Sequence, residues 1–282
     1  MKQKFKLLSA VIIAGSIMVT NAHAQNVNAG VGQTTGVIPK WQNGGAYALT
    51  NSQIQDNGTN VGIGLAPSYK LDVNGHANIA GSSAYKIGGN TMFWNNGNTN
   101  DILIGLNAGN ATMSGHYNNF FGNSAGVNQT TGAGCTFVGY QAGEYNSDGD
   151  YNTFVGYNAG QTAGYTSTTG DYNTIVGVNA GIVSVASHTY SGNSLFGYNA
   201  GQALLTGVNN CFTGYESGSR TTTGSQNVAN GGYALYNNST STWNTAVGYQ
   251  SLYLTSTGGN NTAVGLNAGY TNTTGTYSSK PN

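Results

Sequence analysis

The chain has 282 residues, of which 45 are glycine and only 6% are charged, with eight Lys and Arg residues balancing eight Asp and Glu residues. This balance excludes the basic surface by which proteins bind nucleic acids or anionic membranes. Abundant glycine with little charge is typical either of a disordered tract or of a repeat protein with tight turns, and periodicity distinguishes the two.

Residues 1–24 are predicted to be an export signal. Three lysines within the first six residues precede an apolar run from Leu7 to Val19, and Ala22-His23-Ala24 follows the small-x-small cleavage rule. Loss of those lysines leaves five basic against eight acidic residues, a net charge of −3. Because the apolar run is too short to span a bilayer, we expect a secreted or cell-surface protein whose mature chain enters no membrane.

Two segments separate this signal from the repeats. Residues 25–59 are polar and rich in Gly and Asn, and we expect them to form a flexible lead or an attachment strand. Residues 60–100 contain two short apolar motifs, Val61-Gly62-Ile63 and Leu71-Asp72-Val73, followed by a predicted β segment from Tyr85 to Trp94.

Residues 101–275 consist of ten copies of one motif, written most clearly from Asn152 to Gly160. The central glycine returns after about 17 residues in most units, and longer intervals with small insertions precede Gly177 and Gly197. A polar tail, residues 276–282, follows. The central glycines are Gly105, Gly122, Gly139, Gly156, Gly177, Gly197, Gly214, Gly231, Gly248 and Gly265.

A unit of this length is too short for a pair of helices. Its β-branched and aromatic residues, bounded by Gly, Asn and Thr, are typical of short strands and turns. The sequence therefore predicts an all-β fold, a parallel β-solenoid of about ten coils that stack about 4.8 Å apart.

Asparagine occupies the position four residues before the central glycine in eight of the ten units. Stacked amides can bond to each other along a solenoid axis, as they do in cross-β stacks. The alternative is that each asparagine caps only its own turn. Asn152, Asn173, Asn244 and Asn261 are the clearest members of this column.

Two neighbouring residues before each glycine are both apolar in most units, as in Phe154-Val155 and Ile175-Val176. Neighbouring side chains in a strand point to opposite faces, so one of the two must point out of the coil. Large exposed apolar groups need cover, and we expect a homotrimer in which other copies supply it. The alternative is a wider monomeric solenoid that encloses both positions.

At these residues the chain resembles the head domains of trimeric autotransporter adhesins, most closely at Asn244–Gly248 and Asn261–Gly265. The resemblance covers residues 101 to about 275. It implies a left-handed parallel β-roll wound as a trimer. The chain departs from that family in its longer unit and in lacking a heptad stalk.

Residues 60–75 resemble the segment that opens the repeats of secreted tail-fibre-like proteins. Many of those proteins end in a chaperone domain that trimerises the fibre. The chain stops at Asn282, soon after the last repeat, so we expect neither that domain nor a C-terminal membrane barrel.

The best enzymatic candidate is a group of acids, Glu144, Asp148 and Asp150, with Asp171 one coil further along. Some solenoid enzymes gather acids on one face, but a turn supported by Asp is the simpler interpretation. A loose calcium site at these acids is a further reading, although the tandem Asp-Gly pattern of calcium-binding solenoids is absent. The histidines have no metal-ligand spacing. We therefore expect no enzyme, no cofactor and no metal.

Cys135 and Cys211 lie four coils apart, too far for an intrachain disulfide in a regular solenoid.

A tyrosine often follows the central glycine, and this column is the best binding candidate. Exposed aromatic rings can hold sugars, whereas packing between coils or between chains is the alternative role. The sequence thus predicts a structural or adhesive fibre protein, with a carbohydrate-binding module as the alternative function and a host or environmental glycan or surface as the possible partner. The column comprises Tyr140, Tyr157, Tyr198, Tyr215 and Tyr249.

Overall fold

The computed structural model describes residues 37–41, 49–56, 61–63, 71–73, 84–94, 96, 100–161, 170–183, 189–276 and 279–281. The predicted export signal lies outside these residues. Every regular element among them is a β-strand. No helix in this part of the chain has the length and hydropathy needed to cross a bilayer.

The chain divides into two compact units, Met1–Asn78 and Ile79–Asn282. The first contains a four-stranded sheet of β1 (Val37–Trp41), β2 (Leu49–Asp56), β3 (Val61–Ile63) and β4 (Leu71–Val73), in that order. The two apolar motifs noted in residues 60–75 are β3 and β4, which pair in parallel, whereas β1–β2 and β2–β3 are antiparallel.

The second unit begins with a hairpin of β5 (Ala84–Ile87) and β6 (Asn90–Trp94). Gly88 and Gly89 form its turn with φ angles of 58° and 83°, which glycine adopts without a steric cost. β6 pairs antiparallel with the first strand of the repeats. The predicted β segment from Tyr85 to Trp94 therefore forms the end of the solenoid sheet.

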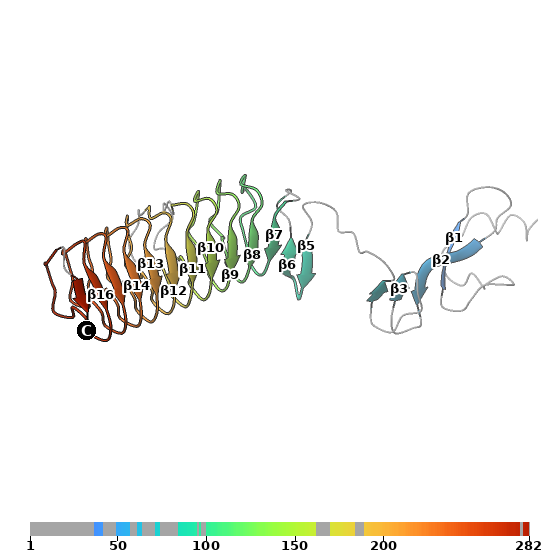
Figure 1. Cartoon of the computed structure of the whole chain (residues 1–282). Helices are drawn as coiled ribbons and strands as arrows, with labels where there is room; N and C mark the ends of the chain where they lie inside the picture. Colours follow the sequence, from blue (N-terminus) through green and yellow to red (C-terminus); the bar gives the residue numbers. More distant parts are fainter. Residues whose placement is uncertain are drawn as a thin grey trace, which may run out of the picture. The chain divides into compact units, whose positions relative to one another are not determined.

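Ten three-residue strands, β7 to β16, stack in parallel along the solenoid, and β17 (Ser279–Pro281) from the tail pairs with β16 (Figure 1). Equivalent residues face each other, as Phe154 faces Phe137 on one side and Ile175 on the other. The prediction of an all-β parallel solenoid built from short repeated coils is confirmed. The strands are β7 (Ile102–Ile104), β8 (Asn119–Phe121), β9 (Thr136–Val138), β10 (Thr153–Val155), β11 (Thr174–Val176), β12 (Ser194–Phe196), β13 (Cys211–Thr213), β14 (Val228–Asn230), β15 (Thr245–Val247) and β16 (Thr262–Val264).

The central glycine is required for the close approach of successive coils. Gly156 has a φ of 137°, in the region that L side chains rarely adopt. A Cβ added there would lie 2.5 Å from the carbonyl oxygen of Gly177 in the next coil. Its N–H donates to the carbonyl of Val138 in the preceding coil at 2.8 Å. The same contact recurs from Gly105 to Gly248.

The asparagine column forms a buried amide ladder. Asn173 donates from its backbone N–H and its side-chain amide to Oδ1 of Asn152, at 2.8 and 3.1 Å. The same amide also donates to the carbonyl of Gly170 in its own turn at 2.9 Å. The amide ladder along the axis is therefore confirmed, and the interpretation that each asparagine caps only its own turn is wrong, because the amide bonds to the neighbouring coil as well as to its own turn. The ladder continues through Asn193, Asn210, Asn227, Asn244 and Asn261.

The residue two before each glycine fills the inside of the coil. The rings of Phe120, Phe137 and Phe154 stack with centroids 4.7 and 4.9 Å apart, and none of the three is exposed. The register between equivalent residues thus produces a continuous aromatic stack across these three coils.

Two later coils exchange large and small residues within this core. A Cβ at Gly218 would clash with the ring of Phe212, so a large inner residue requires glycine six positions later. In the following coil the inner residue is Ala229, and the buried Leu235 fills the space that this alanine leaves. Leu235 has a φ of 51°, a conformation that costs a non-glycine residue roughly 1–2 kcal/mol. The next coil repeats the exchange with Ala246 and Leu252.

Replacing the central glycine is expected to destabilise the solenoid. Gly156→Ala should lower the free energy of unfolding by at least about 2 kcal/mol, because the methyl group meets the next coil and φ is positive. Urea denaturation followed by circular dichroism measures this loss. Gly88→Asn is the matched control, since its φ of 58° suits asparagine and no atom lies within 4 Å. An equal loss in both variants would contradict the close-approach argument.

Candidate functional site

The outward side of the strands carries a partly exposed apolar column. Residues one before each glycine lie on this side, and Val138, Phe196 and Val264 are 37%, 38% and 53% exposed. The inward residues of the same strands are buried. A single chain therefore encloses only one of the two apolar positions, and the alternative of a wider solenoid that covers both is wrong.

Polar residues interrupt this outward column at two successive coils, Thr213 and Asn230. Its apolar members are Ile104, Phe121, Val138, Val155, Val176, Phe196, Val247 and Val264. The parallel column two residues earlier in each strand is mainly Thr and Ser, so the outward face is apolar along one line and polar along its neighbour.

Four of the five tyrosines that follow the central glycine lie on the surface as two stacked pairs. Tyr140 and Tyr157 have ring centroids 5.2 Å apart and 14° from parallel, and Tyr198 and Tyr215 have centroids 5.1 Å apart at 15°. Within each pair the facing rings cover one another. A sugar can therefore stack only at the ends of these pairs, where a ring face is not covered by the next tyrosine.

The tyrosine column is interrupted at two positions, and an aromatic ring from a neighbouring position fills only one of them. Gly232 stands between Tyr215 and Tyr249, and the ring of Tyr233 fills that place with centroids 5.3 and 5.9 Å from its two neighbours. Val178 stands between Tyr157 and Tyr198 and is 44% exposed. The column is thus completed by a ring at one interruption and capped by a small side chain at the other.

The structure also reveals surface aromatic columns that the sequence reasoning missed. Tyr236, Tyr253 and Tyr270 form a second ladder with centroids 5.1 and 5.0 Å apart. Their regular spacing, with one tyrosine at the same position of each of the last three units, was the available signal. Four further aromatic residues are highly exposed with φ between 55° and 64°, and they are Tyr117, Tyr151, Tyr172 and Trp243.

The acids near residue 150 accept hydrogen bonds that join successive coils. Asp150 accepts the backbone N–H of Ala133 at 2.7 Å, and Asp171 accepts that of Asp150 at 2.8 Å. The largely buried Glu144 accepts a bond from the Gln161 amide at 2.7 Å. These bonds fit the interpretation of a turn supported by Asp. No group of three or more potential metal ligands occurs within the described ranges.

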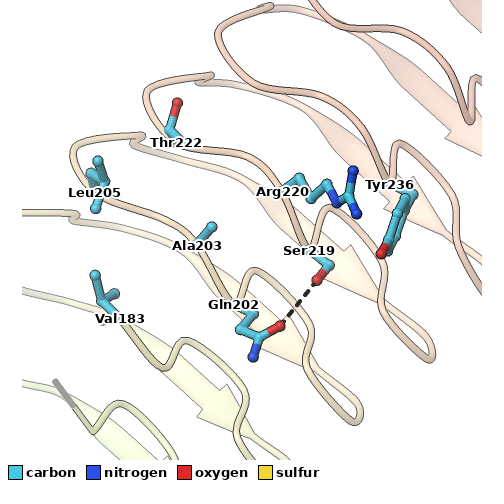
Figure 2. A pocket seen from close by; sticks show the side chains of 8 residues that line it. All are labelled: Val183, Gln202, Ala203, Leu205, Ser219, Arg220, Thr222 and Tyr236. Carbon is cyan, nitrogen blue, oxygen red and sulfur yellow. Dashed lines mark hydrogen bonds between the residues drawn. The ribbon is translucent and has the colours of Figure 1, made fainter. Parts of the chain in front are cut away.

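A shallow groove of about 460 Å³ crosses four consecutive coils outside the strands (Figure 2). At one end the Arg220 guanidinium lies 4.8 Å from the ring centroid of Tyr236 and donates to the Asn237 side chain at 3.0 Å. Ser219 donates to Gln202 at 3.5 Å further along. The lining residues are Val183, Gln202, Ala203, Leu205, Ser219, Arg220, Thr222 and Tyr236.

The two cysteines differ in reactivity because they differ in burial. Both are free, Cys135 buried and Cys211 exposed. Burial is the main cause that raises the pKa of Cys135 to about 11. At pH 8 only about one thousandth of such a thiol is thiolate, the reactive form. The expectation that these cysteines form no intrachain disulfide is confirmed.

Iodoacetamide is therefore expected to modify Cys211 at least tenfold faster than Cys135 in the native protein at pH 8, as measured by peptide mass spectrometry. In urea the rates should converge, because both thiols are then solvated. Equal native rates would contradict the position of Cys135 inside the coil.

Comparison of the chain with protein-family models, with curated proteins and with solved structures found no match.

Proposed function

We propose that this protein is a secreted or cell-surface structural and adhesive fibre protein whose solenoid assembles side by side into a homotrimer. The observation that carries the proposal is the outward apolar column, which one chain leaves partly exposed over many successive coils. Monomeric soluble proteins rarely leave a continuous apolar stripe of that extent without a partner.

The partner that matches this column best is a second copy of the same chain. The column repeats once per coil, at about 4.8 Å. A partner surface with another period would contact the apolar residues of some coils and not of others. Another copy of the chain has the same rise per coil, so it can contact the apolar residue of every coil. Low charge on the solenoid also removes the repulsion that usually keeps identical surfaces apart.

The polar interruption favours copies that run in the same direction around a common axis. In that arrangement each coil meets its own equivalent, so Thr213 and Asn230 face polar counterparts. Antiparallel pairing would instead set Asn230 near the level of Val138 and leave its amide against an apolar surface. Parallel symmetric packing is therefore favoured. The resemblance to trimeric adhesin heads indicates that the assembly contains three chains.

A cysteine placed in the apolar column tests this arrangement. In a Cys211→Ser background, Val155→Cys should give covalent dimers with a short bis-maleimide and covalent trimers with a trifunctional maleimide, because equivalent residues surround the axis. Tyr157→Cys in the same background is the matched control, since it lies two residues further along on the tyrosine column. Denaturing gels that show only monomer for Val155→Cys, or equal cross-linking at both positions, would refute the assembly.

The second candidate function is carbohydrate binding through the tyrosine column, and the interruption at Val178 is the observation that favours it. Tyr157 and Tyr198 lie two coil steps apart, about 10 Å. At the equivalent place over Gly232, the ring of Tyr233 contacts both neighbouring tyrosines edge-on, at interplanar angles of 61° and 86°. Val178 is smaller than a tyrosine, so we expect a sugar to stack there on the ring of Tyr157 or of Tyr198.

Filling that space should abolish such binding without disturbing assembly. Val178→Tyr would complete the tyrosine ladder, so retention on immobilised glycans should fall at least tenfold while the oligomeric mass stays unchanged. Val178→Thr, which keeps the shape of the side chain, is the control and should retain binding. Glycan retention that survives Val178→Tyr would place recognition elsewhere.

A further inference from the structure

We infer that the groove beside Arg220 is a binding site for a sugar that carries a single carboxylate. This site is separate from both the outward apolar column and the column of Tyr157 and Tyr198. It lies on coil segments outside the strands, so the proposed trimer and this site do not compete for the same residues.

The repeats contain a single permanent positive charge, and it lies beside this groove. Arg220 is the only Lys or Arg between residues 101 and 276. A guanidinium has five N–H donors in a rigid fork, and among the described residues Asn237 accepts from one of them. The remaining edge has the geometry that binds a carboxylate through two parallel hydrogen bonds.

The guanidinium of Arg220 is held in place before a ligand arrives. It stacks over one face of Tyr236, and Tyr253 covers the other face with centroids 5.1 Å apart. Tyr253 in turn stacks on Tyr270. The tyrosine ladder therefore acts as a support for Arg220 rather than as a surface for the sugar, and fixing a long side chain in advance reduces the entropy lost on binding.

The lining of the groove suits a sugar. Figure 2 shows Gln202, Ser219 and Tyr236 along one row and Leu205 with Thr222 along another. Amide and hydroxyl groups of this kind bond to sugar hydroxyls, whereas the small apolar side chains contact the C–H face of a pyranose ring. This mixture of apolar lining with a few polar groups is common in small-molecule sites.

The backbone of the groove disfavours a peptide ligand. The N–H groups of Ala203, Leu205 and Arg220 donate to the carbonyls of Ser219, Thr222 and Tyr236 in the next coil, at 3.0, 2.8 and 3.1 Å. These groups already serve the stacking of coils, so an extended acidic peptide finds no strand edge to extend here.

The surrounding charge favours a ligand with one carboxylate over a polyanion. Six acids occupy the same stretch of sequence as the single Arg220, so a ligand with many negative charges is repelled by the solenoid as a whole. The six are Asp101, Glu144, Asp148, Asp150, Asp171 and Glu216.

Methyl glucuronide and methyl glucoside test the site, because they differ only in a carboxylate that replaces a hydroxymethyl group. With the mature protein, saturation-transfer NMR and titration calorimetry should give at least tenfold tighter binding of the glucuronide. Arg220→Gln should remove that preference, and Arg220→Lys should restore only part of it, since an ammonium lacks the planar fork. Glu216→Gln is the matched control outside the groove lining and should keep the preference.

Equal binding of glucuronide and glucoside by the unchanged protein would overturn the proposal without recourse to any variant. So would an Arg220→Gln variant that folds normally and keeps the preference. An acetylated glutamate amide that binds as tightly as the glucuronide would also overturn it, because the groove would then recognise a carboxylate without a sugar.

Discussion

The whole structure depends on the register between equivalent residues of successive coils. Each central glycine, each asparagine of the ladder and each inner side chain stacks on the equivalent residue of the next coil, about 4.8 Å away. This alignment is possible only because the central glycine has no Cβ, which would lie within 3 Å of the next coil's carbonyl group. Once the backbone stacks in this way, the residues at each position of the repeat form a continuous row along the solenoid, in the core, in the asparagine ladder or on the surface.

Because every coil repeats the same pattern, the inside of the solenoid and its outer surfaces have different roles. The inner column and the asparagine ladder supply stability to each coil, and neither reaches solvent. The outward apolar column is unbroken from Ile104 to Phe196, and this length of apolar surface suits the assembly that we propose. Recognition of a small ligand needs the opposite, a place where the repeat changes. Val178 in the tyrosine column and Arg220 in the groove are both such departures.

Much of this fold could be predicted from the sequence, since a short repeating unit with fixed glycine and asparagine positions has few physical solutions. That one of Phe154 and Val155 points inward and the other outward followed from the alternation of side chains along a strand, whereas the burial of Phe154 rather than Val155 is shown by the structure. The exchange of Phe212 for Ala229 with Leu235 could not be predicted, because it depends on which positions meet inside the coil. The acids illustrate the same limit, since the bond from Ala133 to Asp150 joins equivalent positions of two successive coils.

The candidate sites were harder to anticipate than the fold. The tyrosine column was visible in the sequence, but the covering of ring faces by neighbours follows only from the centroid distances. The groove needs the register between coils as well as the side-chain directions of Gln202, Ser219 and Tyr236. A systematic alignment of every position in the unit would have found the second tyrosine ladder, and with it the support for Arg220.

The most direct measurement is the mass of the mature protein by light scattering coupled to size-exclusion chromatography, over a range of concentrations. We expect a single species with three times the mass of one chain and a circular dichroism spectrum dominated by β-structure. A stable monomer with that same spectrum at all concentrations would show that the outward apolar column needs no partner, and it would contradict the central claim.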